Sequence, residues 1–249
     1  MSLLRYATLG GDSFRDEYSL AFDGTDDYVD CGSDSSLDVG TSDFTACCWF
    51  KLETTADGVH HDIIGKCASS LATNTEGWAV SFNGNVGEKK IYFDVGETTG
   101  KDKVLSNAIS YDRWYHVVVT RDNSGNSMKI YIDGVLHQEK SDHTANTLDD
   151  ADRSFKIGGF DSARPLNANI SDVAYYNSAL TSSQVKTIYN GREPYNHKEG
   201  VASGNLQGWW RMGDGLENHS GSTIYDMSTN SNNGTMTNMA SDDFTGDTP

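Results

Sequence analysis

The feature that most constrains the fold is a series of short apolar runs, separated by glycine, asparagine and aspartate, from about Tyr18 to Tyr176. Runs bounded by such turn residues at this spacing are typical of a β-sandwich. The chain contains 25 glycines and only 3 prolines, which favours many tight turns. The expected strands cover residues 19–23, 27–31, 43–52, 62–66, 77–83, 89–95, 113–121, 128–137, 154–160 and 169–176.

Two of these runs predict which side chains share a face. Residues 43–52 place an apolar face on one side of a strand, formed by Phe44, Ala46, Cys48 and Phe50. Residues 113–121 read RWYHVVVTR and are apolar on both sides. One face is Trp114, His116, Val118 and Thr120, and the other is Tyr115, Val117 and Val119. Because apolar groups on both faces need cover on both faces, we expect this strand in the middle of the assembly.

A hairpin and a helix have the clearest local signals. Asp133 and Gly134 stand between alternating apolar runs, and both residues tolerate the positive φ angles of a two-residue hairpin turn. Residues 181–184 read TSSQ, a capping box that starts a helix, and Gly191 follows where the helix should end. We expect this single short helix to seal one end of the sandwich.

The composition changes after Pro194, and it suggests a division of the chain. Residues 195–205 are polar and turn-like, as in a linker, and most of the remainder is serine, threonine, asparagine, glycine and aspartate. We therefore divide the chain into an N-terminal arm (1–16), a sandwich domain (17–194), and a linker with a C-terminal docking tail (195–249). A tail of about 50 residues seldom folds alone.

The tail contains a few apolar residues that need a partner. Trp209 and Trp210 lie on opposite faces of an expected strand, and Ile224 and Tyr225 form one of the few other apolar pieces. These four residues are therefore the candidate assembly residues. The tail could dock on the sandwich, pair with a neighbouring chain as an added strand, or remain loose.

The composition excludes several classes of protein. In the 249 residues, 19 lysines and arginines oppose 36 aspartates and glutamates, which gives a formal net charge of −17. Such acidity argues against a nucleic-acid partner, and no apolar stretch is long enough to insert into a membrane. The four cysteines lack metal-ligand spacing and are expected to be small buried hydrophobes. The N-terminus has no classical signal peptide.

Five segments together resemble the LamG-like, concanavalin A-like jelly-roll family. They occur in the family's order between residues 17 and 192: FDGTDDYVDCG (22–32), DRWYHVVVTRD (112–122), MKIYIDGVL (128–136), FKIGGF (155–160) and ISDVAYYNSALTSSQV (170–185). The resemblance implies an all-β sandwich of two antiparallel sheets. It also implies a carbohydrate or protein ligand, and calcium, in many members.

The tail carries a second resemblance. The segments GWWRMGDG (208–215) and IYDMSTNSNNGTM (224–236) are similar to pieces that begin or link LamG-like units in structural proteins of marine tailed phages. This resemblance implies a homo-oligomer or other virion proteins as partners, and a location on the virion surface or outside the cell.

Calcium is the first candidate ligand. Asp23, Asp26 and Asp27 cluster in one expected turn, and the resemblance implies that the strand carrying Asp172 lies close by. Calcium prefers several hard oxygen ligands and tolerates irregular geometry, so we predict Asp23, Asp26 and Asp172 as ligands. The alternative is that the turn aspartates only shape the turn and Asp172 is a surface charge. A second acidic cluster lies at 149–152 and is expected to be a solvated loop.

No enzyme signature is present in the sequence. Glucanases of this fold carry alternating carboxylates on one strand, as in E-x-D-x-x-E, and no run of this chain has that pattern. His60 and His61 are adjacent in an expected strand and point apart, so they are poorly placed to bind one metal ion. His116 is expected to be a packed structural histidine. We therefore expect a noncatalytic protein.

Two functions remain open, and a third, a divergent glycoside hydrolase, ranks below both because the carboxylate pair is missing. The first is a noncatalytic structural or adhesion protein, a virion surface or decoration component that presents the jelly roll for assembly or host-surface recognition. The alternative is a calcium-dependent, lectin-like module that binds a surface glycan. Aromatic candidates for glycan contact are Trp78, Tyr92, Tyr111, Trp114 and Phe160, although core packing is the expected role of each.

Overall fold

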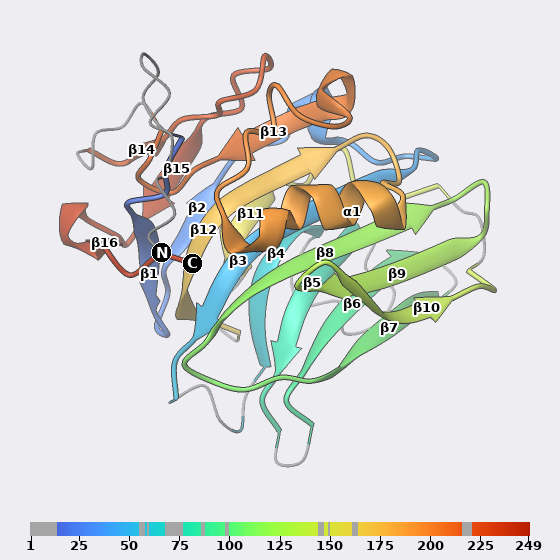
Figure 1. The fold of residues 1–249 in the computed structure, drawn as a ribbon, viewed down its shortest axis with the longest axis horizontal. Helices are drawn as coiled ribbons and strands as arrows, with labels where there is room; N and C mark the ends of the chain where they lie inside the picture. The colour runs from blue at the N-terminus through green and yellow to red at the C-terminus, as the bar shows by residue number, and fades with distance from the viewer. Residues whose placement is uncertain are drawn as a thin grey trace, which may run out of the picture.

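Two antiparallel sheets of eight strands each are stacked face to face in the computed structural model (Figure 1). The structure describes residues 14–54, 58, 60–67, 77–85, 88–97, 100–143, 147–148, 150–160, 164–215 and 221–249. The sequence-based prediction of an all-β jelly-roll sandwich is confirmed.

Sheet A has the strand order β10-β9-β8-β3-β12-β1-β16, and β13 also pairs with β12. Its strands are β1 (Ser19–Asp23), β3 (Phe44–Leu52), β8 (Trp114–Asp122), β9 (Ser127–Ile132), β10 (Val135–Lys140), β12 (Asn167–Tyr176), β13 (Leu206–Trp210) and β16 (Phe244–Thr245).

Sheet B has the order β14-β15-β2-β11-β4-β5-β6-β7. Its strands are β2 (Tyr28–Asp30), β4 (His60–Cys67), β5 (Gly77–Asn83), β6 (Lys90–Glu97), β7 (Gly100–Ala108), β11 (Phe155–Gly158), β14 (Thr223–Ile224) and β15 (Gly234–Thr237). The helices are α1 (Ser182–Tyr189) and the 3-10 turns η1 (Ser35–Leu37), η2 (Asn190–Arg192), η3 (Ser203–Asn205) and η4 (Ser241–Asp243).

The strand β8 is covered on both faces, as its sequence predicts. Tyr115, Val117 and Val119 belong to the core between the sheets, and Val118 belongs to a second cluster on the outer face of sheet A. The same alternation separates the adjacent cysteines of β3, with Cys48 in the core and Cys47 in the outer cluster. All four cysteines are buried and free of disulfides, which confirms the expected small buried hydrophobes.

The hairpin and the helix form where the sequence predicts them. Asp133 and Gly134 have φ angles of 50° and 74° and join β9 to β10. Thr181 caps α1 in a complete capping box with Gln184. The position of the helix differs from the prediction, because α1 lies across the outer face of sheet A (Figure 1) and not at an end of the sandwich. Its buried residue Ile188 packs in the outer cluster of that face.

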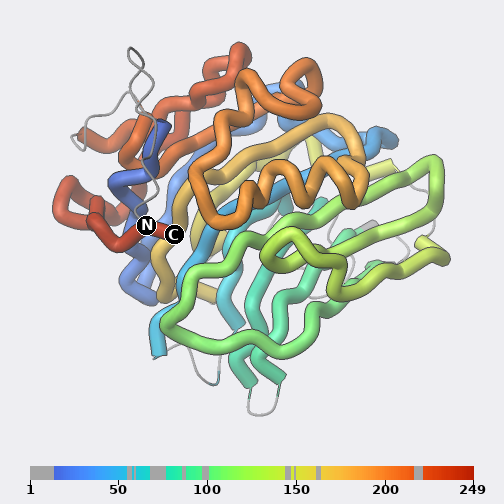
Figure 2. The backbone as a smooth tube through the Cα atoms, in the orientation of Figure 1, coloured from blue at the N-terminus to red at the C-terminus, as the bar shows by residue number. Residues whose placement is uncertain are grey.

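The tail is built into both sheets of its own chain. β13 pairs with β12, β15 with β2, and β16 with β1, the first strand (Figure 2). The segment predicted as a linker is also packed, since His197 is only 1% exposed. The tail therefore docks on the sandwich of its own chain, which is the first of the three alternatives. Residues 195–249 do not form a separate unit.

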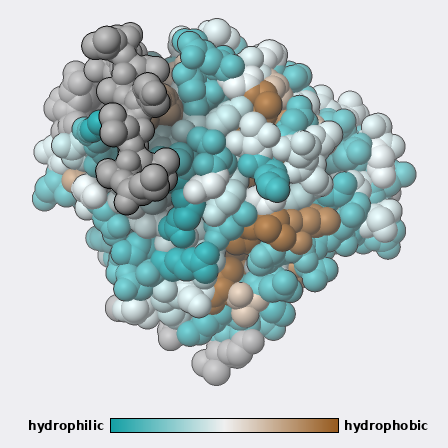
Figure 3. Space-filling model, viewed as in Figure 1, coloured by the Kyte–Doolittle hydropathy of each residue, from teal (hydrophilic) through white to brown (hydrophobic). Residues whose placement is uncertain are grey.

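The surface is largely hydrophilic on the face in Figure 3, with one apolar stripe across it. Among the described residues, the exposed large hydrophobic side chains are Val135 and Leu136, which are 62% and 42% exposed in the edge strand β10.

Candidate functional site

The outer face of sheet B carries polar side chains that are mostly withdrawn from solvent. Strand alternation sends Ile91 and Phe93 into the core, so Tyr92 and Asp94 point outward from β6. We call this surface the polar face. It consists of His60, Asp62, Ser81, Asn83, Tyr92, Asp94, Lys101, Lys103 and Arg164.

Asp94 is the centre of the polar face. The residue is 4% exposed, and the ammonium groups of Lys101 and Lys103 each lie 3.7 Å from its Oδ1 atom. That distance is beyond hydrogen-bond length, and no described residue donates a hydrogen bond to this oxygen. Burial raises the pKa of Asp94 above its usual range, against the lowering influence of Lys101, Lys103 and Arg164.

Tyr92 lies between Asp94 and two further polar groups, the Asn83 amide and the Glu88 carboxylate. The ammonium group of Lys103 lies 4.3 Å from the centre of the Tyr92 ring, within range of a cation–π contact. Asn83 donates a hydrogen bond of 2.8 Å to the Tyr92 hydroxyl, which donates one of 2.9 Å to Glu88. Burial raises the pKa of Tyr92, so the hydroxyl stays neutral and can donate.

Asp62 supplies a second carboxylate at the far side of β5. Its register partner is Ser81, whose own partner is Tyr92, so the three side chains follow one line across the sheet. Arg164 lies 3.8 Å from Asp62, and its charge also acts on Asp94. The polar face therefore combines two carboxylates, three cations, an aromatic ring and neutral hydrogen-bonding groups. Such a set can bind a hydroxyl-rich ligand by donating and accepting hydrogen bonds.

The pKa of His60 shows which charges dominate this face. The ring centre of His60 lies 6.1 Å from that of Tyr92. Burial lowers the pKa of His60, and the charges of Arg164, Lys103 and Lys101 lower it further. The cations thus outweigh the carboxylates at this position, although the whole chain has a charge of −17.

The family model for the concanavalin A-like lectin/glucanases superfamily, Laminin_G_3, matches residues 23–186, about two thirds of the chain. The chain belongs to this superfamily. The resemblance drawn from the five sequence segments is therefore confirmed. The superfamily includes both lectins and glucanases by its description, so membership alone fixes neither binding nor catalysis.

Solved structures share the concanavalin A-like fold at low sequence identity. A presumed carbohydrate-binding protein from Bacteroides ovatus is 17% identical with a TM-score of 0.68, over 93% of this chain and 60% of that one. The heptameric SAP-like pentraxin of Limulus polyphemus is 16% identical with a TM-score of 0.51, over 70% of this chain and 82% of that one. This chain thus spans 60% of the length of the Bacteroides protein.

A toxin domain shares the fold as well. The binding domain of Paraclostridial Mosquitocidal Protein 1 is 14% identical with a TM-score of 0.52, over 70% of this chain and 51% of that one. No curated protein matches the sequence. Among the described residues, no helix has the length and apolar character that a membrane span requires.

The sequence search for paired carboxylates missed Asp62 and Asp94 because it looked within one strand. These residues lie on β4 and β6, with β5 between them, and only the strand register places them on one face. Both carboxylates have cations within 3.8 Å. Burial raises the pKa of Asp94 above its usual range and outweighs the nearby cations, which lower it.

The three predicted calcium ligands are not brought together, which corrects that prediction. Asp23 ends β1 and Asp26 lies in the turn between β1 and β2, and both are exposed. Asp23 is the register partner of Asn167, so Asp172 lies five residues farther along β12, roughly 17 Å away at about 3.3 Å per residue. No three acidic, histidine or cysteine side chains of the described residues are grouped to hold a metal ion. Calcium binding by the turn stays a prediction.

Asp172 has a structural role in the outer layer of sheet A. It sits at a bulge of β12 with a φ of 51°, is 2% exposed, and accepts hydrogen bonds from Trp209 (2.5 Å) and His197 (3.2 Å). Burial favours its neutral form, but the charge of His197 and these hydrogen bonds outweigh burial and hold its pKa below the usual range. Asp172 is therefore not a surface charge either.

The second acidic cluster and His116 have surroundings that differ from each other. Asp149 lies outside the described residues, whereas Asp150 is 1% exposed and accepts hydrogen bonds of 3.2 and 3.3 Å from the Val39 amide. The expected solvated loop is thus wrong for Asp150. His116 is a packed structural histidine, as expected, with its ring 4.9 Å from that of Trp49. Burial lowers the pKa of His116 to about 3.

The candidate assembly residues are in fact core residues of this chain. Trp209, Trp210 and Ile224 are 3%, 0% and 0% exposed. Trp210 stacks on Phe155 at 5.0 Å between the sheets. These three side chains cannot reach another subunit in the folded chain, which corrects their predicted role, and Tyr225 is half-buried beside them.

The aromatic residues that were candidates for glycan contact lie in different parts of the fold. Trp78 is fully buried in the core, and Phe160 packs on Cys67 and Ala79. Trp114 donates a hydrogen bond of 3.0 Å to Asp247. Tyr92 is the candidate that lies among the charged groups of the polar face.

Proposed function

We propose that this chain is a noncatalytic carbohydrate-binding module and that its ligand lies on the polar face. Asp94 carries the proposal. A carboxylate that is 4% exposed, with the ammonium groups of Lys101 and Lys103 at 3.7 Å and no hydrogen bond to Oδ1 from the described residues, is only partly compensated by these ion pairs. A sugar hydroxyl that donates to Oδ1 would complete the compensation.

The neighbours of Asp94 fit the same ligand. Lys101 and Lys103 can donate to sugar oxygens. Tyr92 is 9% exposed beneath the Lys103 ammonium group and holds that lysine in position by a cation–π contact. The Bacteroides protein of the same fold is described in the same terms, as a presumed carbohydrate-binding protein. At 17% identity this likeness supports the choice of ligand class only.

The absence of catalysis, the virion role and self-assembly remain parts of the proposal that need their own tests. A host-surface adhesin would use the same glycan site, so the adhesion reading is compatible with the module. The pentraxin relative is heptameric, which makes the oligomeric state worth measuring. Calcium could order the β1–β2 turn, and an unchanged melting temperature on calcium addition would remove that idea.

A glycan array tests the proposed function. Wild-type protein should bind a defined set of glycans, and Tyr92→Ala should lose most of that signal. Tyr28→Ala is the matched control, because Tyr28 lies elsewhere on sheet B with Lys156 placed 4.5 Å from its ring centre, as Lys103 is placed at Tyr92. Equal binding by the three proteins, no binding at all, or hydrolysis of a bound glycan would contradict the proposal.

A further inference from the structure

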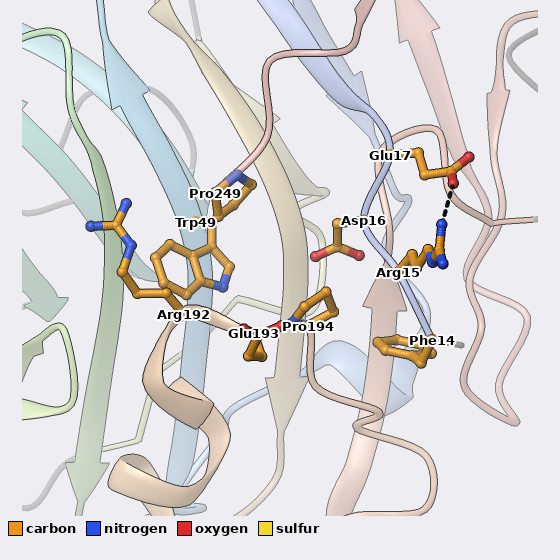
Figure 4. A pocket seen from close by; sticks show the side chains of 9 residues that line it. All are labelled: Phe14, Arg15, Asp16, Glu17, Trp49, Arg192, Glu193, Pro194 and Pro249. Atoms are coloured by element: carbon orange, nitrogen blue, oxygen red, sulfur yellow. Dashed lines mark ion pairs between the residues drawn. The ribbon is translucent and has the colours of Figure 1, made fainter. Parts of the chain in front are cut away.

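A cleft of about 610 Å³ opens on the outer face of sheet A, on the other side of the sandwich from the polar face (Figure 4). This volume lies within the range of about 300–1,000 Å³ that small-molecule sites occupy. The cleft is lined by Phe14, Arg15, Asp16, Glu17, Trp49, Arg192, Glu193, Pro194 and Pro249. The segments come from β3, from the turn after α1, and from both ends of the described chain.

Trp49 forms a rigid wall of the cleft. Its indole is 3% exposed and packs against His116 at 4.9 Å and Tyr189 at 5.8 Å between ring centres. Figure 4 shows the indole between Arg192 and Asp16. Because the ring is fixed by these two contacts, a ligand would meet a preorganised surface, which lowers the entropic cost of binding.

Asp16 is a buried carboxylate held at the edge of the cleft. Its side chain is 5% exposed and lies 2.9 Å from a guanidinium nitrogen of Arg211. Arg211 is itself fixed, since it donates to the carbonyl of Asp214 at 2.7 Å and stacks on the Phe14 ring at 4.2 Å. In Figure 4 the Asp16 carboxylate points toward Trp49 and Pro194.

Arg192 lines the cleft on the other side of the Trp49 indole from Asp16 (Figure 4). It is exposed, its guanidinium lies 6.0 Å from the centre of the Trp49 ring, and its φ is 79°. A side chain with φ in this region is uncommon and carries strain. The strained backbone of η2 directs the arginine over the indole.

The charges of the cleft select a neutral ligand. Burial and the charge of Asp172 raise the pKa of Asp16 to about 7, so this group is largely neutral below that pH. Among the other lining residues, Glu17 and Glu193 oppose Arg15 and Arg192, and Arg15 pairs with Glu17 at 3.8 Å. The signs balance, so no net field favours an ion. Planar groups of both signs around apolar walls suit vicinal hydroxyls, because each hydroxyl both donates and accepts.

We propose that this cleft is a second carbohydrate site, which holds one or two neutral sugar residues along the row formed by Asp16, Trp49 and Arg192 (Figure 4). The inference rests on the proposed function of carbohydrate binding. It adds a site on the opposite sheet, so that a single chain could bridge two glycans.

Calorimetric titration of the full chain tests this inference. The probes are maltotriose, cellotriose, N-acetylchitotriose and methyl α-mannoside. At least one should bind the wild type, and Arg192→Ala and Asp16→Asn should each weaken that binding at least tenfold. Lys186→Ala on the exposed face of α1 and Asp242→Asn in η4 are matched charge controls, and they should change the affinity less than twofold.

The comparison with Tyr92→Ala separates this inference from the proposed function. If Arg192→Ala weakens neutral-sugar binding and Tyr92→Ala does not, the cleft is the site of these probes. If Tyr92→Ala removes all glycan binding and Arg192→Ala removes none, the polar face stands and the cleft inference is overturned. Binding of no probe also overturns it. Arg192 is exposed, so its variant remains informative if Asp16→Asn fails to fold.

Discussion

The outer faces of the two sheets are covered in different ways. On sheet A, Val118, Tyr131 and Tyr176 are buried beneath Val185 and Ile188 of α1 in one apolar cluster. On sheet B, between β4 and β7, most buried outward side chains are polar or charged, with Asp62 and Asp94 at 1% and 4% exposure, beside a small apolar cluster of Cys67, Ala79 and Phe160.

The cover of sheet A is explained by its contribution to stability, whereas the polar face of sheet B is not. Burying apolar area stabilises a fold by about 25 cal/mol per Å², so the cover of sheet A needs no further explanation. Burying carboxylates beside cations adds little and is often less stable than apolar packing. The polar face therefore has the character of a site that is retained for binding, and the following predictions test the contrast.

The largest expected effect is that of removing the tail. Deletion of residues 206–249 takes β13 to β16 from both sheets and removes Trp210 from the core. We expect the truncated chain to lose its cooperative thermal transition, as monitored by circular dichroism. A truncated chain that melts cooperatively near the wild-type temperature would show that the tail is only an appendage.

A matched pair of substitutions compares the two faces directly. Ile188→Ala should lower the free energy of unfolding by about 2–5 kcal/mol, because it leaves a cavity under α1. Asp94→Asn should change it by less than about 1 kcal/mol or raise it, because burial already disfavours the charged carboxylate. Urea denaturation measures both values. A larger loss for Asp94→Asn would assign a structural role to the polar face.

The dependence of stability on pH should reveal Asp16. Burial and the charge of Asp172 raise its pKa from 3.8 to about 7. Between these values the folded state holds a proton that the unfolded state has lost, so this group's contribution to stability falls as the pH rises through the window. Asp27, whose pKa burial raises to about 6, acts in the same direction.

Asp16→Asn removes this dependence on pH. The variant should gain in melting temperature relative to the wild type between pH 5 and pH 8, while Asp27→Asn should gain over a narrower range. If the difference between Asp16→Asn and the wild type is constant with pH, Asp16 does not titrate in this window.

The smallest predicted effect concerns the cap of α1. Thr181→Ala removes the side-chain hydrogen bonds of the capping box and should cost about 1 kcal/mol. Ser183→Ala, on the exposed side of the same helical turn, should change stability less. Equal losses for the two variants would mean that the capping box does not stabilise the helix.

Sequence reasoning succeeds where the signal is local and apolar. The faces of β3 and β8, the Asp133–Gly134 turn and the Thr181 cap each depend on neighbouring residues, and the structure has all four. The strand β7 was not predicted, since GKDKVLSNA contributes only Val104 to the core as an edge strand. Its sequence has no alternation to detect.

The sites depend on register, which the sequence does not specify. Asp172 was expected beside Asp23, but a bulge and the pairing of β1 with β12 separate the two residues. The polar face gathers Asp62, Tyr92 and Asp94 across three strands. The sequence of each strand, taken alone, is that of an ordinary strand with one polar side. No single motif could therefore identify the site.

The affinity of Asp94→Asn for the glycan that binds best on the array tests the central claim most directly. Asp30→Asn is the control, because Asp30 is a half-buried carboxylate on the same sheet, in β2. We predict that Asp94→Asn binds at least tenfold more weakly by calorimetry, with an unchanged melting temperature, while Asp30→Asn binds like the wild type. Wild-type affinity in Asp94→Asn would contradict the assignment of the polar face as the carbohydrate site.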